Sequence, residues 1–172
     1  MTSRVVTKHE RRAMSQAPVL ALLVLLLGQF AIGMAVNLYV AIPARHPGAH
    51  PANYITGSLR SLGWAIGSGP VVLAIHAVLG LLLVLAAARV LTLAIRTHRR
   101  TTTITALLGA VFIIGAGFNG ASFIDFSDNT SSLIMSLLFA LATLSYVVVL
   151  VLEAQPVREL RSPTGGRRAR LS

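Results

Sequence analysis

Four long runs of apolar residues, separated by short polar segments, dominate the chain. The runs cover about residues 17–42, 70–95, 104–124 and 132–152. Each holds about 20 residues or more, and a helix of that length crosses the roughly 30 Å of hydrocarbon in a bilayer. The pattern therefore predicts an all-α fold in which residues 17–153 form a four-helix transmembrane bundle, with polar tails at 1–16 and 154–172.

The segment between the first two runs, residues 43–69, has a pattern of its own. Its first part is rich in proline and histidine and is not helical. Apolar residues then recur at helical spacing, at Ile55, Leu59, Leu62 and Ile66. This predicts a short amphipathic helix on the outer membrane surface. An irregular loop is the alternative, because Gly57, Gly63 and Gly67 weaken a helix.

Composition supports a lipid environment. The chain of 172 residues is 55% hydrophobic and only 12% charged, whereas soluble domains carry about 25% charged residues. The net charge is +10, but the basic residues cluster in tails and one loop, which indicates membrane topology rather than nucleic-acid binding. The chain has no cysteine, so disulfides, thiol catalysis and iron–sulfur clusters are excluded.

Placement of Arg and Lys predicts the orientation. Twelve lie in the tails and in the loop between the second and third runs, and two, Arg45 and Arg60, lie on the other side. This asymmetry favours cytoplasmic termini in a plasma-membrane protein. A cleaved signal peptide is the alternative for the first run, but the apolar stretch continues to Ile42 and is too long for one.

Several polar residues interrupt the apolar runs. Phe-x-Ile-Gly-x-x-x-Asn occurs at 30–37 and again at 112–119, which places two asparagines at similar depth. We expect a polar cluster in the outer half of the bundle, formed by Asn37, His76, Asn119 and Ser136. Two interpretations stay open: the amides hold helices together, or they contact a ligand.

His76 is the single histidine inside an apolar run, and it is the candidate cofactor-binding residue. The alternatives are a bridge between helices, a ligand of haem b or a quinone, and a role in moving protons or a solute. Six-coordinate haem b needs a second strong axial ligand. A second intramembrane histidine is absent, which leaves Met34 and Met135.

Other polar residues suggest weaker sites. His46 and His50 stand four residues apart, but prolines prevent a helix there and no carboxylate or thiolate is near, so they are weak metal ligands. Arg89 and Glu153 are a candidate ion pair, with Arg89 reaching the headgroups as the alternative.

Gln29 is expected to bond Thr143, Ser145 or Tyr146 of the fourth run. Asp125 and Asp128 are interpreted as helix-capping residues.

Two short stretches carry a resemblance. Gly117–Asp125 (GFNGASFID) and His76–Gly80 (HAVLG) resemble small four-span membrane proteins of actinobacteria, a likeness that implies a fold and no activity. A looser likeness is to four-helix haem-handling membrane proteins, such as half of a haem A synthase. Those proteins use paired intramembrane histidines, and this chain offers only His76.

No Gly-x-x-x-x-Gly-Lys-Ser/Thr phosphate-binding loop, zinc-protease motif or nucleophile elbow occurs in the sequence. The leading functional expectation is therefore a non-enzymatic membrane component that acts alone, as a homo-oligomer or beside a membrane-protein partner. A redox subunit centred on His76 is the alternative, and a small-solute transporter is the third.

Overall fold

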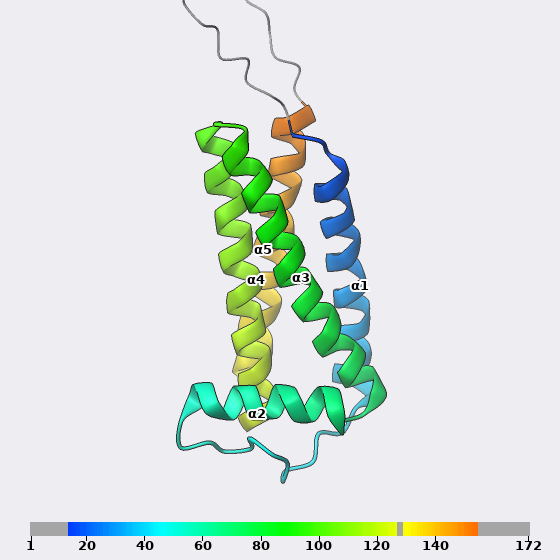
Figure 1. Ribbon diagram of the computed structural model, residues 1–172. Helices are drawn as coiled ribbons and strands as arrows, with labels where there is room; N and C mark the ends of the chain where they lie inside the picture. The colour runs from blue at the N-terminus through cyan, green and yellow to red at the C-terminus, as the bar shows by residue number, and fades with distance from the viewer. Residues whose placement is uncertain (1–13, 127–128, 155–172) are drawn as a thin grey trace, which may run out of the picture.

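In the residues that the structure describes, 14–126 and 129–154, a computed structural model shows five α-helices. They are α1 (Ala17–Tyr39), α2 (Tyr54–Gly67), α3 (Val71–Arg96), α4 (Arg100–Phe126) and α5 (Asn129–Ala154). The four long helices stand side by side, and α2 lies across one end of them (Figure 1). We call this the α2 end. The opposite end, where α1 begins and α5 finishes, is the terminal end.

The four long helices are each long and apolar enough to cross a membrane. Large apolar side chains cover their outward faces; Val24 is 71% exposed and Leu85 67%. Such a surface is stable against lipid tails and not against water. The chain is therefore a multi-pass membrane protein, as the apolar runs predict.

Helix boundaries differ from the limits of the apolar runs. The first helix ends at Tyr39, and Val40 is extended with φ −104° and ψ 113°. Pro43 has no N–H to donate to the Tyr39 carbonyl four residues earlier, so it cannot continue the helix. Conversely, α4 continues beyond the predicted 104–124 at both ends. Apolar runs mark the thickness of the hydrocarbon, whereas hydrogen bonding continues a helix into the headgroup region.

The predicted short helix between the first two long helices is present as α2. Asn53 caps its start by accepting a hydrogen bond from the Thr56 backbone N–H, 3.1 Å away. Its packed face is made of small residues, Gly57, Ser58, Ser61 and Ala65. Its apolar residues form the exposed ridge, with Ile55 at 64% and Leu59 at 65% exposed.

The glycines of α2 are the reason for the alternative of an irregular loop, but Gly57 serves the packing of this helix. A Cβ atom at position 57 would lie 2.2 Å from Cβ of Pro51. Gly48, at φ +103°, packs against the same helix, where a Cβ would lie 2.6 Å from the Gly57 carbonyl oxygen. Small residues thus let the segment before α2 fold directly onto it.

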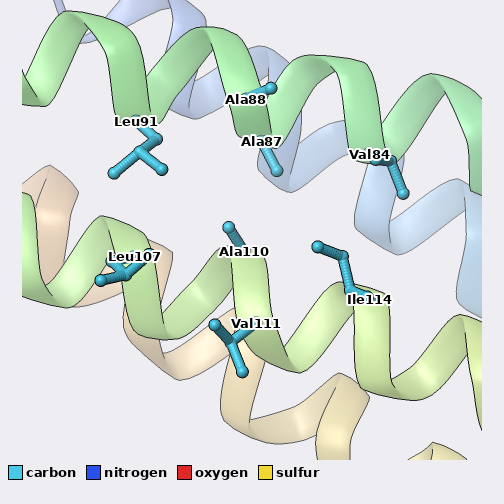
Figure 2. A pocket seen from close by; sticks show the side chains of 8 residues that line it. All are labelled: Val84, Ala87, Ala88, Leu91, Leu107, Ala110, Val111 and Ile114. Carbon is cyan, nitrogen blue, oxygen red and sulfur yellow. The ribbon is translucent and has the colours of Figure 1, made fainter.

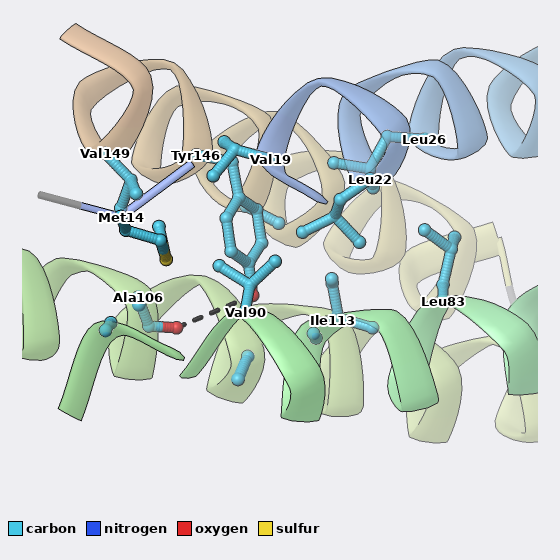
Figure 3. Packing of buried hydrophobic residues seen from close by; sticks show 14 residues of the cluster. Met14, Val19, Leu22, Leu26, Leu83, Val90, Ala106, Ile113, Tyr146 and Val149 are labelled. Carbon is cyan, nitrogen blue, oxygen red and sulfur yellow. Dashed lines mark hydrogen bonds between the residues drawn. The ribbon is translucent and has the colours of Figure 1, made fainter. Parts of the chain in front are cut away.

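The core of the bundle lies towards the terminal end. Figure 3 shows Val19 and Leu22 of α1 packed beside Tyr146 of α5 and Val90 of α3. All four of these side chains are at most 1% exposed. The Tyr146 hydroxyl points towards the Ala106 carbonyl oxygen, 3.5 Å away, so the one polar atom of this side chain faces an acceptor.

The most extensive contact in the bundle is between α4 and α5. Gly109 makes room for the Tyr146 ring, since a Cβ at 109 would lie 2.8 Å from it. Gly115 and Gly120 similarly face Leu138 and Met135. The small residues of α4 therefore do permit close packing, as expected, although nothing lies within 4 Å of a Cβ at Gly117.

Candidate functional site

His76 faces α1 from the second turn of α3. Its Nε2 atom lies 3.2 Å from Nε2 of Gln29, so with the amide as donor the ring accepts this bond. The ring fills the space opposite Gly33, where a Cβ would lie 2.9 Å from Cε1. The Gln29 amide in turn lies against Gly80, 3.4 Å from the position of a Cβ.

We call these contacts between the antiparallel helices α1 and α3 the clasp. It consists of Gln29, Gly33, His76 and Gly80. Gln29 and Gly33 are four residues apart in α1, and His76 and Gly80 are four apart in α3. Residues at this spacing lie on one helix face, so each polar side chain meets the glycine of the other helix. The expected partners of Gln29 in α5 bond elsewhere: Thr143 and Ser145 donate to carbonyls of their own helix.

The clasp leaves two buried polar atoms without a hydrogen-bond partner, Oε1 of Gln29 and Nδ1 of His76. With Nε2 of the ring accepting, Nδ1 carries the proton and is a free donor, while Oε1 is a free acceptor. An unpaired polar group in the hydrocarbon region is costly. These two atoms are therefore the unused donor and the unused acceptor of the contact.

The other residues of the expected polar cluster do not join His76. The Asn119 amide donates to the Gly115 carbonyl oxygen at 2.9 Å, and the Ser136 hydroxyl donates to Ser132 at 2.9 Å, so each bonds its own helix. Asn37 is exposed in the last turn of α1. Bonds to a carbonyl one turn earlier satisfy such side chains locally, which removes the need for them to converge.

Glu153 is buried at the terminal end and has a different partner from the one expected. Its Oε1 atom lies 3.6 Å from Nη1 of Arg99, and the carboxylate side chain is 0% exposed. It accepts from the Thr102 hydroxyl at 3.0 Å and from the Met14 backbone N–H at 2.7 Å. Arg89, the partner predicted from sequence, is exposed on α3. Glu153 thus ties α5 to the start of α4 and to the chain before α1.

Asp125 is the corresponding carboxylate at the α2 end, 2% exposed. It accepts hydrogen bonds from the hydroxyls of Ser58 and Ser61, both on the packed face of α2. Its backbone oxygen accepts from the His50 N–H at 3.1 Å. The sequence suggested a helix cap, whereas the structure shows a tie between α4 and α2. The available signal was two serines three residues apart, on a face made of small residues. Asp128 lies outside the described residues.

His46 and His50 do not share a site. The His46 ring stacks on Trp64, with centroids 4.5 Å apart, and its Nε2 lies 3.1 Å from the Ile124 carbonyl oxygen. The His50 ring instead lies edge-on to Phe126, at 6.0 Å. Within the described part of the chain, no three or more His, Cys, Asp or Glu residues are grouped to hold a metal ion.

A cleft of about 180 Å³ opens between α3 and α4. Figure 2 shows that side chains of both helices line it, with Ala87 of α3 pointing towards Ala110 of α4. All of its lining side chains are apolar. The cleft offers no polar group to a hydrophilic solute, so it suits hydrocarbon only.

Comparisons of this chain with protein-family models, with curated proteins and with solved structures found no match.

Proposed function

We propose that the chain is a non-enzymatic component of the plasma membrane, with four spans, both termini in the cytoplasm and α2 on the outer surface. The observation that carries this proposal is the use of the two buried carboxylates. Glu153 binds together segments at the terminal end, and Asp125 binds α2 at the other. The two buried carboxylates therefore hold together the segments at the two ends of the membrane unit.

The orientation rests on charge. Arg96, Arg99 and Arg100 lie at the terminal end, where the two basic tails also attach. Arg45 and Arg60 are the basic residues of the segment at the α2 end. Because cytoplasmic segments carry the excess of Arg and Lys, the terminal end is assigned to the cytoplasm.

The exposed ridge of α2 supports a position in the membrane interface. Ile55, Leu59 and Ile66 are exposed, and α2 lies across the long helices rather than parallel to them (Figure 1). A helix in this position lies at headgroup depth, where an apolar ridge enters the acyl region and residues such as Tyr54 and Trp64 are favoured. Polar residues of its packed face meanwhile bond Asp125.

Reporter fusions test the orientation. Alkaline phosphatase and green fluorescent protein, each fused in turn after residue 50 and at the C-terminus, should report opposite sides of the membrane. We expect phosphatase activity at residue 50 and fluorescence at the C-terminus. If both positions report the same side, the four-span arrangement is refuted; if the two signals are interchanged, the arrangement stands and the orientation is refuted.

A second candidate function is a redox subunit that binds a quinone, and the clasp favours it. The free Nδ1 donor of His76 suits a quinone carbonyl. Haem is less well supported, because Nε2 already faces Gln29. Solvent extraction of the purified protein tests the quinone, and an absorption spectrum tests haem. Quinone bound by the wild type and lost in His76→Leu supports the redox function; a colourless, quinone-free preparation contradicts it.

A further inference from the structure

The cleft between α3 and α4 is open to the surroundings of the bundle. Its floor is formed by Ala87 and Ala110, which are 2% and 8% exposed and point towards each other (Figure 2). Its walls are exposed, Leu107 to 47% and Val111 to 53%. Both helices are long and apolar enough to cross a membrane, so an open apolar cleft between them adjoins the acyl chains of lipids.

The long axis of the cleft follows the two helices. Leu91 and Leu107 lie at one end of it, and Val84 and Ile114 lie at the other (Figure 2). Seven residues separate the ends on each helix, so the cleft is about 10 Å long. The end with Leu91 and Leu107 is nearer the terminal end of the bundle, where α3 finishes and α4 begins. An extended acyl chain running along the helices matches this shape.

Arg100 stands beyond the same end of the cleft. It is the first residue of α4 and is exposed. Residues seven apart lie on one face of a helix, so Arg100 is on the face of α4 that carries Leu107, about 10 Å further towards the terminal end. The far end of the cleft, at Ile114, is about 21 Å from Arg100. One leaflet with its headgroups is about 20 Å deep, so a single lipid molecule spans this distance.

The charge of Arg100 has no acidic partner among residues 14–126 and 129–154. The two acidic side chains in those ranges are Glu153, which contacts Arg99, and Asp125, which lies at the α2 end. Arg96 adds a further positive charge close by in the chain, and the positive end of the α4 dipole lies at Arg100 itself. This end of the cleft therefore favours an anionic group.

We propose that the cleft and Arg100 together bind one phospholipid with an anionic headgroup. One acyl chain lies in the cleft between α3 and α4, and the guanidinium of Arg100 binds the phosphate through paired hydrogen bonds. Basic sites between membrane-spanning helices bind anionic headgroups in this way. A choline headgroup would instead bring a second positive charge to a place without a described acid. The proposal goes beyond the proposed function and holds for either orientation, because the cleft and Arg100 share one leaflet.

Native mass spectrometry of the full chain in detergent tests the proposal. The probes are phosphatidylglycerol and phosphatidylcholine with identical acyl chains, each added at increasing concentration, so that the two titrations differ only in the headgroup. We expect one saturable phosphatidylglycerol on the wild type, bound at least about fivefold more tightly than phosphatidylcholine, the effect of one arginine near the membrane surface.

Two variants test the two parts of the site. Ala110→Leu fills the floor of the cleft and should abolish the saturable binding of both lipids. Ala140→Leu is its control, because Ala140 is exposed on α5 and away from the cleft; it should bind as the wild type does.

Arg100→Gln should weaken phosphatidylglycerol roughly fivefold and leave phosphatidylcholine unchanged. Arg96→Gln removes the same charge from an exposed position that is about 140° around α3 from Leu91. It should have a smaller effect than Arg100→Gln.

Three results would overturn the proposal. Saturable binding that persists in Ala110→Leu would place the lipid elsewhere. Equal affinity of the wild type for the two lipids, or equal effects of the two arginine variants, would remove the role of Arg100. A wild-type dimer that Ala110→Leu abolishes would show that a second copy of the chain occupies the cleft.

Circular dichroism establishes that each variant is folded. Should Ala110→Leu fail to fold, photo-crosslinking of the wild type replaces it, with phosphatidylglycerol that carries a diazirine in one acyl chain. At low lipid-to-protein ratio the label should concentrate in residues 84–91 and 107–114. Label spread evenly over the exposed faces of the four long helices would refute the site.

Discussion

Gln29 of α1 and His76 of α3 join their helices by a direct contact, 3.2 Å between the two Nε2 atoms. Each side chain lies over a glycine of the opposite helix, Gly80 and Gly33 respectively. The polar pair contributes little by itself, since interhelical hydrogen bonds in membranes average about 0.6 kcal/mol. The close approach allowed by the glycines is therefore the larger part of this contact.

Replacement of Gly33 by alanine should destabilise the bundle by about 1–3 kcal/mol, the usual cost of overpacking. The new methyl group would lie 2.9 Å from Cε1 of His76, and moving the ring breaks its bond to Gln29. Gly28→Ala is the control on the same helix, because nothing lies within 4 Å of a Cβ there. Reversible unfolding in mixed micelles measures both. Equal stabilities of the two variants would contradict the clasp.

A second glycine prediction concerns the contact between α4 and α5. Gly109→Ala would place a methyl group 2.8 Å from the Tyr146 ring. That ring is fully buried, so we expect a loss of about 1–3 kcal/mol. Gly117→Ala in the same helix meets open space and should leave the melting temperature unchanged or raise it slightly. A Gly109→Ala variant that is as stable as the wild type would contradict the described packing of α5 against α4.

Arg99 and Arg89, which both lie towards the cytoplasmic side in the proposed orientation, should behave differently. Arg99 contacts Glu153 at 3.6 Å and donates to the Leu152 carbonyl oxygen at 3.2 Å, whereas Arg89 is exposed. Removing a partner of a buried carboxylate is costly, of order 3 kcal/mol when the pair is fully buried. Arg99 is 20% exposed, so we expect about 1–2 kcal/mol for Arg99→Ala.

Arg89→Ala should cost less than about 0.5 kcal/mol, as for most exposed positions. The measurement is chemical unfolding of both variants in the same detergent. A larger loss of stability in Arg89→Ala than in Arg99→Ala would instead support the pairing of Arg89 with Glu153 that the sequence suggests.

Attachment of α2 depends on Asp125, and Ser61→Ala should loosen it. The substitution removes a buried hydroxyl bound to the carboxylate. Among the described residues, the Ser58 hydroxyl is the side-chain donor that remains. An unsatisfied buried acceptor costs about 1–3 kcal/mol. Hydrogen–deuterium exchange should therefore speed up in α2 and not in α5. Ser136→Ala is the control, since that hydroxyl bonds its own helix and is exposed; it should leave α2 protected.

Sequence alone determines the membrane unit and the helix between its first two spans. Hydrocarbon of fixed thickness requires apolar runs of matching length, so the four long helices can be read directly. The spacing of Ile55, Leu59, Leu62 and Ile66 likewise predicts α2. These features are local, because every backbone hydrogen bond of a helix connects residues of one short stretch.

Tertiary structure alone decided which polar residues meet. Glu153 bonds Arg99 rather than Arg89, Gln29 bonds α3 rather than α5, and Asp125 ties α2 instead of capping a helix. Partner choice depends on helix rotation about its axis, and in lipid the apolar residues around a helix do not fix that rotation, because lipid tails are as apolar as leucine. Small residues such as Gly33 and Gly109 set it through close contact, and that contact exists only once the helices are together.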